Sequence, residues 1–142
     1  VSNCFILPSF LVSNSEENLR EFSNKLVLFE KLRREIEFFE SNKELDSPEL
    51  GSFLSKSKPL SVIIAMQDGD PSLRRALGEI YIQRVIDPKN IKIVKDLCIS
   101  EGSVKKVKKI SDDYKKYSLD FMNDLNFNEN EQNTIFSLIE NI

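Results

Sequence analysis

The feature that most constrains the fold is a run of apolar residues spaced three or four positions apart. On a helix this spacing places all of these side chains in one stripe. The run extends over about six turns and comprises Leu19, Phe22, Leu26, Phe29, Leu32, Ile36 and Phe39. Ser13 and Glu16, just before it, have the spacing of a capping box. The sequence therefore predicts a long amphipathic helix that carries this stripe.

Further helices are predicted by three pairs of a capping residue and a proline, Ser47-Pro48, Asp70-Pro71 and Asp87-Pro88. The first residue of each pair accepts hydrogen bonds from free amides, and the proline has a helical φ. We expect helices near residues 48–56, 71–86 and 88–99. Apolar spacing predicts another helix over 103–125 and a last one capped by Asn128, with Ile135, Leu138, Ile139 and Ile142 packed inward.

The apolar run from Leu60 to Met66 is rich in β-branched residues, which are typical of a strand. A single strand would lack a pairing partner here, so we predict a buried helix. The chain has 142 residues and four glycines. We therefore predict an all-α fold, a compact bundle of about six to seven helices in a single domain over residues 1–142. Because the chain begins within an apolar segment, we interpret it as a fragment of a longer chain.

Composition excludes several classes of chemistry. The chain has no histidine, which removes the commonest general base and metal ligand. Its net charge of −3 provides no overall attraction for nucleic acid or an anionic membrane. Cys4 and Cys98 are interpreted as buried, reduced thiols. No stretch approaches the roughly 20 apolar residues of a membrane-spanning helix. We therefore expect a soluble, intracellular protein.

Pairs of acidic residues are the first candidates for a metal or acid–base site. They are Glu35 with Glu37, Asp68 with Asp70, Asp112 with Asp113, and Asp120 with Asp124. Residues two apart on a helix point to different faces, and Asp70 is explained as a cap. Asp120 and Asp124 share a face, but two carboxylates alone hold magnesium weakly. We interpret all four pairs as solvated surface.

Residues 93–110 resemble a bacterial helix-turn-helix, in which Lys105, Lys106, Lys108 and Lys109 would face DNA phosphates. Against this, Cys98 occupies the turn position that favours glycine, and the second helix continues past Asp112. A generic helical corner explains the same residues. Lys56 and Lys58, on either side of Ser57, are candidate contacts for a phosphate or diphosphate, with solvated loop lysines as the alternative.

Taken in order, these segments resemble the C-terminal half of the trans-prenyl diphosphate synthases, which are all-helical. Residues 11–22 resemble the family's approach to its long helix, and residues 26–39 resemble that helix. Leu50-Gly51 resembles a Leu-Gly pair after it. Residues 58–66, KPLSVIIAM, are similar to the family's basic residue followed by S-L-P-I-I-Y-A-L. Residues 68–73 fit a common continuation, and the last two helices resemble the closing hairpin.

The second aspartate-rich motif of the family, D-D-x-x-D, is degenerate here. The corresponding residues are Arg34, Glu35, Ile36, Glu37 and Phe38. In the family these aspartates hold magnesium against the substrate diphosphate. Arg34 repels a metal ion and Phe38 offers no ligand, so only Glu35 could reach one. The resemblance thus implies that the chain alone does not catalyse prenyl transfer, and that magnesium enters only through a catalytic partner or a missing N-terminal half.

These expectations combine into one functional hypothesis. The chain is a non-catalytic prenyl synthase-like subunit or C-terminal fragment that supports isoprenoid chain elongation by binding a catalytic subunit, or that associates with itself. The expected interface is the second apolar fringe of the long helix, Val27, Leu28 and Phe38. The alternatives are a helix-turn-helix regulator centred on residues 93–110 and a helical protein-interaction module without enzymatic ancestry.

Overall fold

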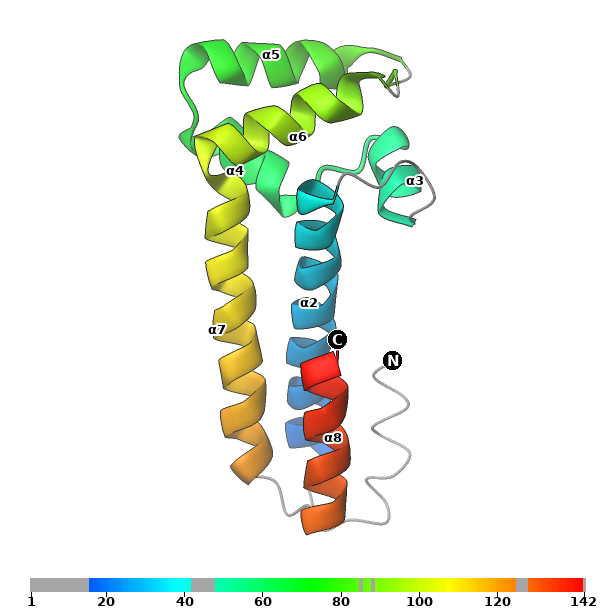
Figure 1. Cartoon of the computed structure of the whole chain (residues 1–142), viewed down its shortest axis with the longest axis vertical. Coiled ribbons are helices and arrows are strands. Elements are labelled where there is room, and N and C mark those ends of the chain that lie inside the picture. Colours follow the sequence, from blue (N-terminus) through cyan, green and yellow to red (C-terminus); the bar gives the residue numbers. More distant parts are fainter. Residues whose placement is uncertain (1–15, 42–47, 85, 88, 125–127, 142) are drawn as a thin grey trace. The chain divides into compact units, whose positions relative to one another are not determined.

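The computed structural model describes residues 16–41, 48–84, 86–87, 89–124 and 128–141, and every regular element in these ranges is an α-helix (Figure 1). The helices are α2 (Glu16–Glu40), α3 (Pro48–Leu54), α4 (Leu60–Asp68), α5 (Pro71–Ile82), α6 (Lys89–Glu101), α7 (Ser103–Asp124) and α8 (Glu129–Asn141). The prediction of an all-α fold is confirmed. Residues 60–66 are helical, as expected, and not a strand.

The helices form two units. One contains residues 34–109, and the other contains residues 1–33 together with residues 110–142. The expectation of a single domain over residues 1–142 stays a prediction. Among the helices that the structure describes, none combines the length and apolar composition that a bilayer-crossing segment needs.

The unit of residues 34–109 has a hydrophobic core to which six helices contribute. In this unit α4, α5 and α6 pack against one another (Figure 1). The buried side chains include Phe39 of α2, Phe53 of α3, Val62 and Ala65 of α4, Leu77 and Tyr81 of α5, Val94 and Cys98 of α6, and Val104 of α7. The C-terminal end of the predicted stripe therefore supplies one wall of this core.

The unit of residues 1–33 and 110–142 joins the first part of α2 to the second part of α7. Phe22 is fully buried and stacks on Phe121, with ring centroids 6.5 Å apart. Nearby, Tyr117 donates a 2.7 Å hydrogen bond to Glu21, and the Lys25 ammonium lies 4.8 Å from the Tyr117 ring centroid. The stripe residues Leu26, Phe29 and Leu32 are buried, and so is Ile135 of α8.

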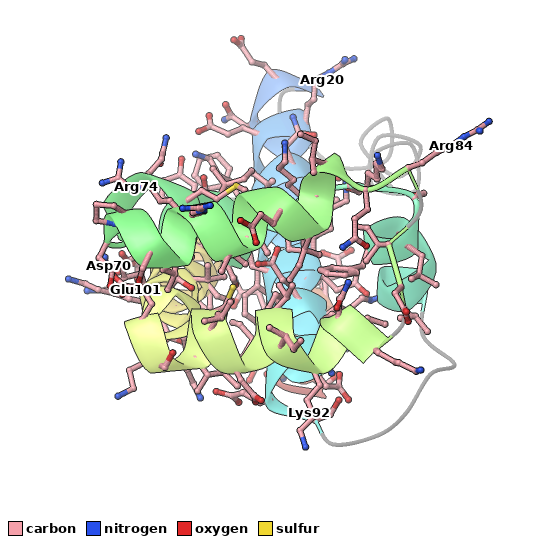
Figure 2. The ribbon with its side chains drawn as sticks, turned by 90° about the horizontal axis from the view of Figure 1, so that it is seen from above. Arg20, Asp70, Arg74, Arg84, Lys92 and Glu101 are labelled. Carbon is pink, nitrogen blue, oxygen red and sulfur yellow. The ribbon has the colours of Figure 1, made fainter. Side chains whose placement is uncertain are left out.

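Helix starts follow the predicted capping residues. The Asp70 carboxylate accepts hydrogen bonds from the amides of Ser72 and Leu73, at 2.7 and 2.9 Å. The Ser72 hydroxyl donates a further 2.7 Å bond to the same carboxylate at the start of α5 (Figure 2). This hydroxyl bond, followed by the two amide bonds, holds the pKa of Asp70 below its usual value. Asp87 accepts a 2.9 Å bond from the amide of Lys89.

Asn128 and Glu131 form a reciprocal capping box at the start of α8, where the amide of each donates to the side chain of the other. Other predicted features lie outside the described residues: Cys4, Ser13, Ser47 and Ile142, and the side chains of Glu16, Leu19, Leu138 and Ile139.

The turn between α6 and α7 requires glycine. Gly102 has φ +81°, a backbone conformation that a residue with a Cβ adopts only with strain. Gly78, in the interior of α5, has ordinary helical φ and open space around the position of a Cβ. Both glycines are uncrowded, so only the backbone conformation distinguishes them.

We therefore expect opposite effects from the same substitution at these two positions. Gly102→Ala should lower the free energy of unfolding by about 1 kcal/mol because of the left-handed backbone. Gly78→Ala should raise it by about 0.5–1 kcal/mol because alanine is the better helix former. Urea unfolding followed by circular dichroism measures both. Equal effects at the two positions would contradict this account of the turn.

Candidate functional site

Glu35 caps the start of α4. It lies near the end of α2, and its Oε2 accepts a 2.9 Å hydrogen bond from the amide of Leu60. Its Oε1 accepts bonds from the amide of Ser61 at 2.7 Å and from the Ser61 hydroxyl at 2.6 Å. The first amides of a helix lack partners within the helix and carry the positive end of its dipole. A carboxylate from a distant helix satisfies them here.

Phe38, which the resemblance places opposite the last aspartate of the prenyl synthase motif, packs into an aromatic cluster. Its ring lies 5.5 Å from that of Phe39 in a T-shaped arrangement and 6.3 Å from that of Phe53. The Lys95 ammonium lies 4.1 Å from the Phe38 ring centroid and donates a 3.2 Å bond to the carbonyl of Ser41. Burial lowers the pKa of Lys95. Phe38 thus contributes to packing inside this unit.

Arg34, Glu35 and Phe38 do not fit the magnesium site that the family resemblance implies. Arg34 is an exposed cation, and Phe38 belongs to the aromatic cluster. Both oxygens of Glu35 accept hydrogen bonds from α4 and its first serine. In the described part of the chain, no group of three or more Asp, Glu, His or Cys side chains gathers in a way that could hold a metal ion.

The two candidate diphosphate contacts lie at the same end of α4 as Glu35. Lys56 and Lys58 are both exposed, and Lys56 has φ 66°. The Lys58 ammonium lies 5.7 Å from the ring centroid of Tyr81. The structure therefore brings three distant parts of the chain to one region: Lys58 from the segment before α4, Tyr81 from α5 and the Glu35 cap from α2.

Tyr81 and Cys98 are buried polar groups that the sequence analysis did not connect. The Tyr81 hydroxyl is buried without a hydrogen-bond partner among the described residues. Burial, followed by the proximity of Cys98 and Glu35, raises the pKa of Tyr81. Burial also raises the pKa of the Cys98 thiol to about 11. The apolar spacing of α5 and α6 predicts that Tyr81 and Cys98 face inward, but it does not predict that they belong to the same buried cluster.

The burial and the raised pKa of the Cys98 thiol can be tested by its reactivity and by the pH dependence of stability. A thiol reacts as the thiolate, so Cys98 should resist a thiol reagent at neutral pH until the chain unfolds. Because its pKa rises from 9.0 to about 11 on folding, its contribution to stability is present below pH 9 and lost as the pH rises towards 11. The thermal midpoint should therefore fall more steeply over this window than in Cys98→Ala. Labelling is best done in a chain with Cys4 replaced by serine, so that only Cys98 can react. If the thermal midpoint depends on pH equally in the unmodified chain and in Cys98→Ala, the raised pKa of Cys98 is contradicted.

The predicted interface residues fall in different units. Val27 is half-buried and Leu28 has 41% of its surface exposed, both in the unit of residues 1–33 and 110–142. Phe38 belongs to the other unit, where it is half-buried in the aromatic cluster. Leu28 is therefore the most accessible of the three.

The acidic pairs are mostly surface residues. Glu37, Asp112, Asp113 and Asp120 are exposed, and the side chain of Asp124 lies outside the described residues. Asp68 forms an ion pair with Lys106 at 2.7 Å, and Asp70 caps α5. These contacts account for Asp68 and Asp70 without a bound metal.

The residues of the proposed helix-turn-helix form the corner between α6 and α7. The tight turn is at Gly102, four residues after Cys98, and Cys98 lies inside α6. Lys105, Lys106, Lys108 and Lys109 are exposed on α7. Lys106 pairs with Asp68, and Lys108 lies 3.5 Å from a carboxylate oxygen of Glu40. Two of the four lysines therefore have acidic neighbours within the unit.

Comparison with protein-family models gave no match, and comparison with curated proteins and with solved structures gave no significant match. The functional assignment therefore depends on the residues and contacts described above.

Proposed function

We propose that this chain is a non-catalytic helical scaffold of the prenyl diphosphate synthase type, which supports isoprenoid chain elongation by binding a catalytic partner. The proposed family comes from the order of the sequence segments, which resemble those in the C-terminal half of the trans-prenyl diphosphate synthases. The non-catalytic part comes from what the residues of the degenerate motif do in the fold. The binding part comes from exposed apolar side chains on α2.

The observation that carries the proposal is the capping contact of Glu35. A magnesium ligand must present free carboxylate lone pairs to the ion. Glu35 instead accepts three hydrogen bonds, two from backbone amides and one from the buried Ser61 hydroxyl. Withdrawing it would leave these donors without partners, which costs free energy. This supports a structural role at the position where the resembling enzymes bind metal.

The packing of Phe38 supports the same interpretation. An aspartate at this position would place a charge next to Phe39 and Phe53, in apolar surroundings. Phe38 instead extends the core of this unit. The helix that carries the motif in the family is thus retained here as a packing element, with its chemistry replaced by apolar contact.

The surface offered to a partner includes Leu28 on α2. The exposed Leu28 side chain provides a small apolar surface for a partner. Val27, the preceding residue, is half-buried. Apolar side chains without charge are enriched at the centre of protein interfaces. The partner that this proposal commits to is a catalytic trans-prenyl diphosphate synthase subunit.

Two assays test the proposal. The purified chain, incubated with isopentenyl diphosphate, an allylic diphosphate and Mg²⁺, should form no prenyl product. The chain should also co-purify with one of the trans-prenyl diphosphate synthases of its own organism, when each is co-expressed with it, and should change the rate or product length of that enzyme. Leu28→Lys should weaken co-purification, whereas Glu17→Lys on the exposed first turn of the same helix should not.

Product formation by the chain alone would disprove the non-catalytic role. Failure to co-purify with any of these synthases would disprove the partner. An equal effect of Leu28→Lys and Glu17→Lys would show that the interface lies elsewhere, and the choice of Leu28 would then be abandoned.

A second candidate function is binding of duplex DNA by the corner of α6 and α7, and it is favoured by the exposed lysines Lys105 and Lys109 at the start of α7. Its test is a titration of duplex DNA at two salt concentrations. Phosphate contacts by Lys105 and Lys109 would give a steep loss of affinity with salt, and Lys105→Ala should reduce that slope by about one. Absence of salt-sensitive binding would eliminate this function.

A further inference from the structure

We draw no further inference here: the strongest candidate, the apolar outward face of α4 formed by Leu60, Ile63 and Ile64, is partly exposed, and nothing in the structure shows what covers it.

Discussion

Replacing Glu35 with alanine should lower the free energy of unfolding by about 2–4 kcal/mol, because a lost hydrogen bond to a charged group costs about 1.5–3 kcal/mol and water replaces part of the three bonds lost at this half-buried position. The substitution leaves the amides of Leu60 and Ser61 and the Ser61 hydroxyl without their acceptor. It also removes a negative charge from the positive end of α4. Urea unfolding followed by circular dichroism measures the loss.

Two further variants separate capping from metal binding. Glu35→Gln keeps an oxygen acceptor but loses the charge, so its loss should be smaller than that of Glu35→Ala. Ser61→Ala removes only the hydroxyl bond and should cost about 1 kcal/mol. Because Glu35 caps a helix, Mg²⁺ should leave the thermal midpoint of the unmodified chain unchanged. A midpoint that rises with Mg²⁺ in the unmodified chain but not in Glu35→Ala would identify Glu35 as a metal ligand.

Phe53→Ala should be more damaging still, with a loss of about 3–5 kcal/mol in the free energy of unfolding. Phe53 has only 1% of its surface exposed, and its ring contacts those of Tyr81, at 5.7 Å, and Phe38. It anchors α3, which has 7 residues and is too short to be stable as an isolated helix. Removing the ring leaves a cavity and releases α3 from the core.

The neighbouring Leu54 provides the matched control. It is half-buried at the edge of the same core, so Leu54→Ala should cost clearly less than Phe53→Ala. Hydrogen exchange should show that amides of α3 lose protection in Phe53→Ala by more than those of α5. Equal losses for the two variants would mean that α3 is held by its backbone contacts and not by the aromatic cluster.

The helices could be predicted from the sequence because the signals that start them are local. Asp70 reaches the amides of Ser72 and Leu73, two and three residues away, and Pro71 has the φ of a helix. Asn128 and Glu131 likewise satisfy each other. The helix ends were less accurate, since α5 ends at Ile82 and not at residue 86. The last residues of a helix depend on packing as well as on local preference.

The candidate site could be predicted only in part. The resemblance to prenyl diphosphate synthases led to the prediction that Arg34, Glu35 and Phe38 stand where that family has a metal motif, with Glu35 as the residue that could reach a metal ion; this stays a prediction. The partner of Glu35 lies 25 residues later in the sequence, at the start of α4. The contact between the Lys58 ammonium, in the segment before α4, and the Tyr81 ring of α5 also joins residues that are far apart in the sequence. Such contacts depend on how the helices pack, and helical periodicity does not specify it.

The sequence by itself therefore determined that this protein is built of helices, which faces of them are apolar, and where several of them begin. The physical reason is that helix periodicity and capping act over a few residues. Only the tertiary structure decided what the buried and charged side chains do. It uses Glu35 as a cap, places Phe38 in an aromatic cluster and leaves Ile82 exposed. These outcomes depend on which helices meet, because a side chain contacts whichever helix the packing of the core brings to it.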